Sequence, residues 1–209
     1  MRRLLDAGPD ATVRIHTFQH PDAWALALST GTLSGSAAHA DPDYAEQYEW
    51  MRDRMRELVP GYGGGFPVWA YLARPNMRRH PYGEPRVLVA ADVPRRRMVL
   101  SDLDRWVEAL NRVHLADDGD GMRLLEDDGT QTWDGERGIT PAMRDSWLAV
   151  LDLDADAWPA AKRAYWGRAA SVQACIEWIR LDEVAWASTV RGRLGRVGAV
   201  DDDGPPPPR

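Results

Sequence analysis

The sequence predicts an α+β domain built on a mostly antiparallel β-sheet, whole or split, with several helices packed against it. Six short segments have the alternating or β-branched pattern of strands, at residues 13–18, 67–72, 86–90, 98–100, 172–179 and 184–187. Helical patterns lie between the first and the last of these segments, and the regular strand–helix alternation of a doubly wound parallel sheet is missing. These features favour antiparallel pairing.

The composition is that of a single soluble domain. The chain has 209 residues, of which 44% are hydrophobic and 28% are charged. We expect one domain over residues 13–195, preceded by an extension over 1–12. The acidic and proline-rich tail over 196–209 cannot bury enough apolar surface to fold and is expected to be disordered. The acidic, glycine-rich stretch 116–138 is expected to be a loop or a mobile insertion.

Composition also argues against several classes of protein. No stretch approaches the roughly 20 consecutive apolar residues of a membrane span, and the chain reaches Asp6 before a signal-peptide core can form. We therefore expect a cytoplasmic protein with no membrane partner. The single cysteine, Cys175, excludes an internal disulfide and a thiolate zinc site. A net charge of −6 argues against bulk attraction to nucleic acid, although it is compatible with a local basic patch.

Helix and loop signals follow the first strand. Pro21 suits the first position of a short helix, and Gly31 suits its end. A second helix is expected over residues 41–58, with an apolar face formed by Tyr44, Tyr48, Met51, Met55 and Leu58. Four glycines in the five positions 61–65 carry too much chain entropy for a regular element, so this segment is expected to be a loop that acts as a hinge or a lid.

Capping signals mark two later helices. Ser101, with Asp104 three residues on, resembles a capping box, and the helix after it has an apolar face of Leu103, Trp106, Val107 and Leu110. Thr140 caps another helix, which carries Trp147, Leu148 and Leu151. In the strand predicted over 172–179, one face holds Gln173, Cys175 and Glu177. The other face is the better core face, with Val172, Ala174, Ile176 and Trp178.

Familiar catalytic and metal motifs fail on their own chemistry. The glycine loop lacks the Gly-Lys-Ser/Thr ending of a Walker loop and the spacing of a Rossmann fingerprint. Neither a G-x-S-x-G elbow nor an H-E-x-x-H zinc motif is present. Five residues that could be assembled into a metal site have no recurring spacing: His16, His20, His39, Asp41 and Asp43. Asp41 is better explained as a helix cap, so no metal is predicted.

Aromatic residues are the compositional oddity of the chain, with ten tryptophans against two phenylalanines. Three of them lie beside aliphatic residues on helix faces and are expected to pack in the core: Trp24, Trp106 and Trp147. Trp69 and Tyr71 instead point to the same side of one strand, next to the glycine loop. They could form an aromatic wall for a planar ligand ring or belong to the core. Glu177 likewise suits either a pocket carboxylate or a solvent-facing strand surface.

Short motifs follow one another along most of the chain. In the first half they are Thr17-x-Gln19, Trp24, Gly31-x-Leu33, Tyr48-x-Trp50-Met51 and Pro67-x-Trp69-Ala70. Further on they are Leu100-Ser101-Asp102-Leu103-Asp104-x-Trp106, Leu110-Asn111, and Gln173-Ala174 with Glu177 and Leu181. In this combination residues 13–187 resemble an uncharacterised bacterial family of domains of unknown function. Leu103 and Val107 depart from the family, which usually has phenylalanine and often has histidine at these two positions, so a reaction that needs that histidine would be lost here.

The layout of the chain carries a second, more distant resemblance. An opening strand, a helix and the Gly31-x-Leu33 turn precede a central aromatic strand, and a late Gln-Ala strand bears a glutamate. This order is similar to that of the DarT-type and related ADP-ribosyltransferases. The resemblance implies a split, mostly antiparallel sheet around NAD, and an enzyme that transfers ADP-ribose from NAD, its substrate, to an acceptor.

The chemistry that this resemblance implies breaks the bond between nicotinamide and ribose through an oxocarbenium-like state, which a nearby carboxylate can stabilise. Glu177 is the candidate catalytic residue. Thr17 and Gln19 are expected to hydrogen-bond the ribose or the nicotinamide, and an arginine such as Arg14 or Arg74 to pair with the pyrophosphate. The expected NAD-binding set is Thr17, Gln19, Trp69, Tyr71, Arg74 and Gln173.

Two other functions stay open at this point. A non-catalytic binding module, with an aromatic-rich groove for a nucleotide or a partner, would leave Glu177 exposed and without a pocket joining it to Thr17 and Trp69. A metal-dependent hydrolase would need His16, His39 and nearby aspartates to converge. The acceptor of a transferase, whether a protein, a nucleic acid or a small molecule, is not specified by the sequence.

Overall fold

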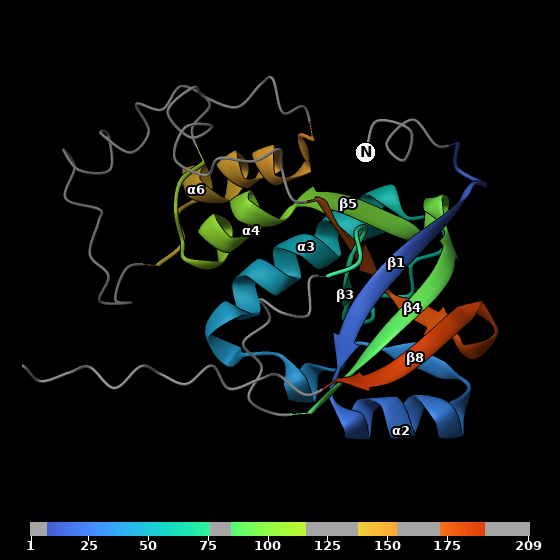
Figure 1. Cartoon of the computed structure of the whole chain (residues 1–209). Helices are drawn as coiled ribbons and strands as arrows, with labels where there is room; N and C mark the ends of the chain where they lie inside the picture. The colour runs from blue at the N-terminus through green and yellow to red at the C-terminus, as the bar shows by residue number, and fades with distance from the viewer. Residues whose placement is uncertain (1–7, 76–84, 116–137, 154–171, 191–209) are drawn as a thin grey trace, which may run out of the picture.

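The computed structural model describes residues 8–75, 85–115, 138–153 and 172–190 (Figure 1). In these ranges the strands form a six-stranded sheet in the order β5-β6-β3-β1-β4-β8 and a two-stranded sheet, β2-β7. Every pairing is antiparallel, which confirms the predicted α+β class. The predicted tail over 196–209 lies outside the described residues, as do nearly all of the predicted insertion over 116–138 and most of the extension over 1–12.

The strands and helices have the following bounds. The strands are β1 Thr12–Gln19, β2 Thr32–Ser34, β3 Val68–Tyr71, β4 Arg86–Pro94, β5 Met98–Asp102, β6 Val172–Ile176, β7 Trp178–Arg180 and β8 Val184–Val190. The α-helices are α2 Pro21–Thr30, α3 Ala45–Leu58, α4 Leu103–Leu110 and α6 Pro141–Ser146, and the 3₁₀ turns used below are η2 Pro42–Tyr44 and η4 Trp147–Leu151. The α-helix predicted after Thr140 is therefore shorter than expected, because Trp147, Leu148 and Leu151 lie in η4.

The helix after the first strand forms as its end signals predict. Pro21 opens α2, and Gly31 ends it in the left-handed region at φ 81°, where its amide donates to the carbonyl of Ala27. The start of α3 differs from the prediction, because Asp41 caps the 3₁₀ turn η2 and the regular helix begins only at Ala45. Its buried face comprises Gln47, Trp50, Met51 and Met55, whereas Leu58 is exposed at the helix end.

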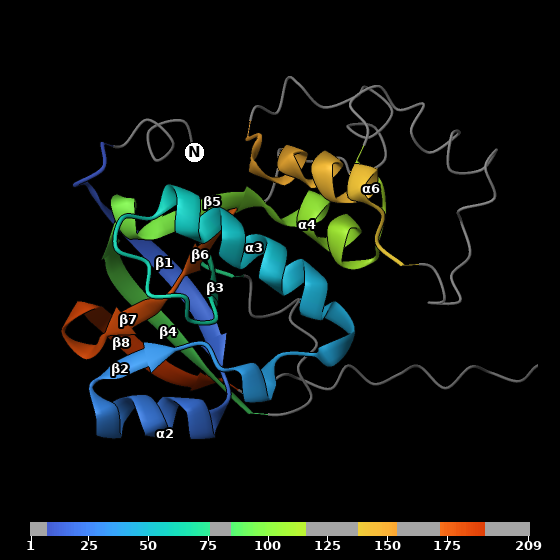
Figure 2. The same ribbon diagram turned by 180° about the vertical axis from the view of Figure 1, so that it is seen from behind.

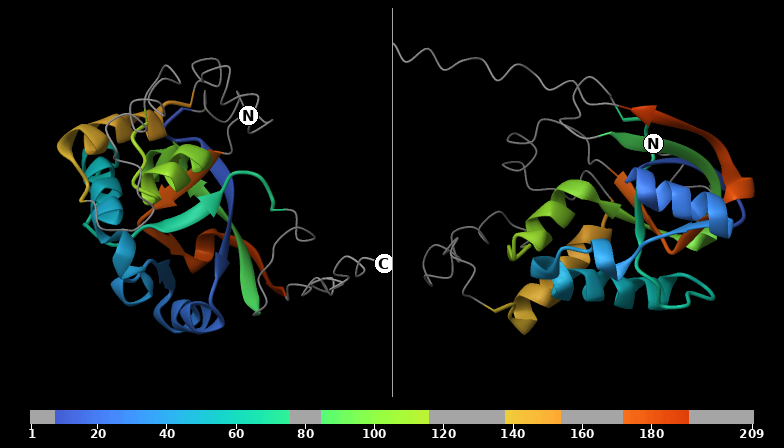
Figure 3. Two further views of the ribbon diagram at one scale, coloured as in Figure 1. Left: turned by 90° about the vertical axis from the view of Figure 1, so that its left-hand side faces the viewer. Right: turned by 90° about the horizontal axis from the view of Figure 1, so that it is seen from below.

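Both faces of the large sheet are covered. On one face α2, β2 and β7 contribute Ala27, Leu33 and Ile179 to a core that includes Ile15 and Ala174. On the other face α3, α4 and η4 contribute Trp50, Met51, Trp106 and Trp147, which pack with Cys175 of β6. Figures 2 and 3 show α3, α4 and α6 grouped together and α2 set apart from them. Strand β6 is therefore buried on both sides, which corrects the expectation that only one of its faces belongs to the core.

The large sheet parts between β1 and β3. All eight residues of β1 pair with β4, but only His16 pairs with a residue of β3, Tyr71. Beyond that pair the two strands separate, and the hydroxyl of Thr17 donates to the carbonyl oxygen of Trp69 at 2.7 Å. The sheet thus consists of two three-stranded halves, β5-β6-β3 and β1-β4-β8, joined at one residue pair.

The cap of α4 is Asp102, not the predicted Ser101. Asp102 Oδ1 accepts hydrogen bonds from the amides of Asp104 at 2.9 Å and Arg105 at 3.1 Å, whereas Ser101 still belongs to β5. The other carboxylate oxygen, Oδ2, is buried and has no hydrogen-bond partner. Burial raises the pKa of Asp102 from 3.8 to about 6.

This cap predicts a pH-dependent stability. Because the folded state binds the Asp102 proton more tightly than the unfolded state, the contribution of this group is fully present below about pH 4 and is lost as the pH rises through about 6. An asparagine side chain at this position would keep an accepting oxygen at the cap but would not titrate. We expect the unfolding free energy of Asp102→Asn, relative to wild type, to rise by about 3 kcal/mol between pH 4 and pH 7. Urea unfolding at several pH values measures this difference, and a difference independent of pH would contradict it.

Candidate functional site

Two hollows open where the sheet parts. The smaller, of about 130 Å³, is lined by Phe18, Trp69, Ala70, Tyr71 and Gln173. The larger, of about 530 Å³, shares Phe18 and Trp69 with it and extends between the end of β1, α2, β2 and the segment before β3. Its other described lining residues are Gln19, Ala23, Leu26, Ala27, Thr30, Thr32, Ser34, Gly35, Ser36, His39, Ala40, Tyr48, Phe66, Pro67 and Val68.

A row of three polar side chains crosses the sheet at the smaller hollow. Tyr71 of β3 pairs with His16 of β1 on one side and with Gln173 of β6 on the other. Residues that are directly paired across strands have their side chains on the same face of the sheet. The fold therefore brings together three side chains that can form hydrogen bonds, from the first, the middle and the late part of the chain.

Two members of this row have buried polar atoms without a partner. His16 is 7% exposed and Gln173 is 4% exposed. The Nδ1 atom of His16 and the Nε2 atom of Gln173 are buried and form no hydrogen bond. Such orphaned groups are rare in folded proteins because each costs about 1–3 kcal/mol. Of these two residues Gln173 lines the smaller hollow, so its Nε2 is the polar atom that a ligand in this hollow could satisfy.

Burial and nearby charges favour the neutral form of His16. Burial lowers the pKa of His16, the positive charges of Arg14 and Arg74 lower it further, and a hydrogen bond with the backbone of Tyr71 opposes this shift. Arg14 is held by Asp92 through two bonds of 2.5 and 2.6 Å. Within the described residues Arg74 has no such ion pair; its guanidinium lies over the ring of Trp186, 5.1 Å from the ring centroid. Of the two arginines considered for a phosphate, Arg74 is the one whose charge is not already matched.

The predicted polar pair of β1, Thr17 and Gln19, forms hydrogen bonds within the protein. Thr17 is fully buried and donates to the carbonyl of Trp69. Gln19 Nε2 in turn donates to the hydroxyl of Thr17 at 2.8 Å, which fixes the orientation of the Gln19 amide at the larger hollow. Gln19 therefore faces a cavity, whereas Thr17 fastens the two strands where they part.

The predicted aromatic wall belongs both to the core and to the hollows. Trp69 stacks on Trp106 with ring centroids 4.8 Å apart and lies 6.5 Å from the ring of Tyr48. Tyr71 meets Phe18 edge to face at 6.3 Å. Because the large aromatic core fixes Trp69 from behind, its position at the two hollows is rigid.

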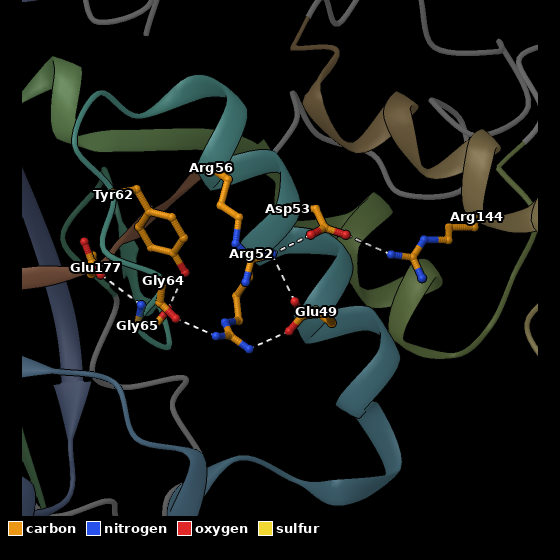
Figure 4. Close-up of polar contacts among 9 residues, drawn as sticks. All are labelled: Glu49, Arg52, Asp53, Arg56, Tyr62, Gly64, Gly65, Arg144 and Glu177. Carbon is orange, nitrogen blue, oxygen red and sulfur yellow. Dashed lines mark hydrogen bonds and ion pairs between the residues drawn. The ribbon is translucent and has the colours of Figure 1, made fainter.

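Glu177 lies away from both hollows. It is half-buried between β6 and β7, and its Oε2 accepts a hydrogen bond from the amide of Gly63 at 2.9 Å. Its Oε1 accepts one from the amide of Gly65, also at 2.9 Å (Figure 4). Glu177 is absent from the described lining of either hollow, so the structure does not bring it to face Thr17 across an aromatic pocket. The strand breaks after Ile176, and the side chain that follows turns to the glycine loop. A catalytic role for Glu177 stays a prediction.

The residues considered for a metal do not converge. No group of three or more histidine, cysteine, aspartate or glutamate side chains that could hold an ion occurs in the described ranges. His16 belongs to the buried row, His39 lines the larger hollow, and Asp41 caps η2.

Comparison with known families identifies the chain. Residues 14–166 match the domain of unknown function DUF3841. The chain belongs to this family. The matched range includes β1, β3 and the glycine loop, while β6, β7 and β8 follow it. Neither the curated proteins nor the solved structures gave a match. Among the helices that the structure describes, none is long and apolar enough to cross a membrane.

The sequence patterns do not indicate two residues of this region. They indicate His16 as a possible metal ligand and Phe18 as part of a strand. Alternation along β1 puts these two side chains on one face, and that much could be read from the sequence. Their meeting with Tyr71 and Gln173 depends on which strands pair, and no local pattern specifies that pairing.

The unpartnered amide of Gln173 makes a stability prediction. Methionine has a similar length and no polar atom to satisfy, so Gln173→Met should raise the unfolding free energy by about 1 kcal/mol. Gln47 is a useful comparison, because it is also buried and its Nε2 donates to the carbonyl of Leu110 at 3.0 Å, while its Oε1 is buried without a partner. Gln47→Met removes that unpartnered oxygen but leaves the Leu110 carbonyl without its donor, so it should not raise the unfolding free energy as Gln173→Met does. A loss of unfolding free energy in Gln173→Met, measured by urea unfolding, would show that Gln173 has a partner in the protein.

Proposed function

We propose that this chain binds NAD where its sheet parts and is an ADP-ribosyltransferase-like enzyme that transfers ADP-ribose to an acceptor. One observation carries the proposal: Tyr71 and Gln173, which line an aromatic hollow, stand in one row with His16, and the Nε2 atom of Gln173 is buried and unpartnered. A flat ring that bears an amide would use both the aromatic walls and the unpartnered polar atom.

The smaller hollow suits the nicotinamide end of the ligand. Phe18, Trp69 and Tyr71 provide apolar ring faces and edges, which favour a planar heteroaromatic ring over a flexible aliphatic group. The Nε2 group of Gln173 can donate to the carboxamide oxygen of nicotinamide and so gain the partner that it lacks. His16 stands next to Tyr71 in the row, outside the described lining, and its lowered pKa favours the neutral imidazole, so it adds no charge near the ring.

The charged and uncharged parts of the ligand would separate between two regions. Arg74, whose guanidinium lies over Trp186, supplies a planar fork for the pyrophosphate. The larger hollow has no charged side chain in its described lining apart from the ionisable His39, and it offers hydroxyls, aromatic rings and the fixed amide of Gln19. That lining suits the sugar and base of the dinucleotide better than its phosphates.

The transfer needs charge stabilisation and orientation more than covalent help. The bond between the ribose C1′ and the nicotinamide nitrogen breaks, its electron pair leaves with nicotinamide, and a nucleophilic atom of the acceptor forms the new bond to C1′ as its proton passes to solvent. In the oxocarbenium-like state the positive charge would lie near the faces of Trp69 and Tyr71. Gln173 would orient the ligand through a hydrogen bond.

A non-catalytic nucleotide-binding module is the second candidate, and one observation favours it. No carboxylate belongs to the described lining of either hollow, and both oxygens of Glu177 are engaged by the glycine loop. A site of this kind would bind NAD without breaking it. The acceptor of the transferase, whether a protein, a nucleic acid or a small molecule, is left to experiment.

Titration with NAD tests the proposal. Binding should quench tryptophan fluorescence, because Trp69 lines both hollows. Gln173→Leu should weaken binding about tenfold through the loss of one hydrogen bond. Glu46→Gln, an exposed change on α3 away from both hollows, should bind as wild type does. The proposal would be contradicted if wild-type protein does not bind NAD, or if Gln173→Leu binds NAD as tightly as wild type does.

Release of nicotinamide separates the two candidates. The transferase predicts free nicotinamide, detected by chromatography, when NAD is incubated with a lysate or with defined acceptors, and it predicts less of it with Gln173→Leu. The binding module predicts tight NAD binding with no nicotinamide released under any of these conditions.

A further inference from the structure

Both carboxylate oxygens of Glu177 are bound by one loop. Its two oxygens bind two amides of one loop, Gly63 and Gly65, and these glycines have no side chain that would hold the carboxylate away. A Cβ atom added to Gly63 would lie 3.0 Å from Glu177 Oε1, and one added to Gly65 would lie 3.1 Å from it. Gly64 between them has φ 92°, which favours glycine. The loop is thus shaped to receive this one side chain.

The same loop is held from its other side. Arg52 of α3 donates to the carbonyl of Gly64 at 2.5 Å, and the Tyr62 hydroxyl donates to the carbonyl of Gly65 (Figure 4). The guanidinium of Arg52 also lies over the ring of Phe66, 4.9 Å from its centroid. Amides therefore point to Glu177 and carbonyls to α3 and Tyr62, so the loop has a defined conformation.

The loop leads directly into one wall of the larger hollow. Phe66 and Pro67, which follow it, both line that hollow. Their carbonyls pack on Gly35, where an added Cβ would lie 2.5 Å from the Phe66 oxygen and 2.7 Å from the Pro67 oxygen. A shift of the glycine loop would be transmitted to this wall because no space separates the backbone segments.

Glu177 also stands at the start of the adjoining wall, which packs on the first through Gly35. The next residue, Trp178, pairs with Ser34 of β2, and Ser34 and Gly35 line the larger hollow. The carboxylate thus joins the segment that carries Phe66 and Pro67 to the strand pair that carries Ser34.

We propose that Glu177 is a positioning residue that fixes the place of two adjoining walls of the larger hollow by tying the glycine loop to the junction of β6 and β7. It acts on ligand affinity through the two walls and has no contact with the reacting atoms. This inference rests on the proposed function for its ligand, NAD, but its geometric part can be tested without any ligand.

The kinetic test separates positioning from catalysis. With NAD as substrate, Glu177→Ala should raise KM about tenfold and leave kcat within about twofold of wild type. Glu177→Gln keeps one accepting oxygen and should show a smaller rise in KM. Glu46→Gln, an exposed glutamate on α3, is the control for loss of one negative charge. A fall in kcat of a hundredfold or more with unchanged KM would overturn the proposal and make Glu177 a catalytic residue.

Hydrogen exchange tests, in the ligand-free protein, whether Glu177 holds the glycine loop and the two walls in place. In Glu177→Ala the amides of Gly63 and Gly65 should exchange at least tenfold faster, and so should those of Phe66 and Ser34 on the two walls. Faster exchange confined to Gly63 and Gly65 would overturn the proposal, because the walls would then be independent of the carboxylate. If Glu177→Ala does not fold, as judged by circular dichroism, Glu177→Gln provides the same comparison.

Failure of the inference and failure of the proposed function are distinguishable. Wild-type protein that binds no NAD would remove the proposed function, while the exchange of the wall amides would still decide whether Glu177 holds the hollow. Wild-type binding of NAD together with unchanged wall exchange and unchanged KM in both Glu177 variants would remove only the inference.

Discussion

One residue pair, His16 with Tyr71, joins the two halves of the large sheet. All eight residues of β1 pair with β4, and beyond His16 no residue of β1 pairs with β3, so the edge of β3 is open there. An open edge inside a sheet leaves polar backbone groups to satisfy, and the hydroxyl of Thr17 meets one of them by donating to Trp69. The space that remains is the smaller hollow. The location of the site is therefore a consequence of where the pairing stops.

An aromatic core makes this opening possible. Trp50, Trp106 and Trp147 pack beneath β3 and β6, and Trp69 joins them through its stack on Trp106. Burial of such large rings is the main stabilising contribution on this face of the sheet. It offsets the cost of the polar groups that His16 and Gln173 leave unpartnered in the next row. A stiff apolar foundation below a polar row is an arrangement that keeps a binding site in place before the ligand arrives.

The sequence predicts the local features of this fold better than the distant ones. Gly31 and Thr140 end and cap helices as expected, since a left-handed φ and a side-chain acceptor at an N-terminus are local requirements. The shared face of Trp69 and Tyr71, and that of Gln173 and Cys175, also follow from alternation along one strand. Local chemistry fails where two residues compete for one role, as at the cap of α4, where Asp102 replaces Ser101 because the strand continues one residue longer.

The candidate site could be predicted only in part, for a physical reason. Alternation gives the face of each side chain within its own strand, but the register that sets Tyr71 opposite Gln173 depends on contacts between residues about a hundred positions apart. The break after Ile176 cannot be predicted from the local sequence either, because the residues that follow it pair with β2, a distant strand. Glu177 therefore lies on the glycine loop, although its strand pattern placed it beside Gln173.

The side-chain amide of Gln173 offers the most direct measurement. In ¹⁵N-labelled protein its NH₂ signals, assigned through Gln173→Leu, should shift on addition of NAD together with the indole signal of Trp69, while the NH₂ signals of the hydrogen-bonded Gln47 stay in place. This pattern is expected if NAD binds at the smaller hollow, beside Tyr71 and Gln173. NAD-induced shifts that spare Gln173 and Trp69, or no shifts at all, would contradict it.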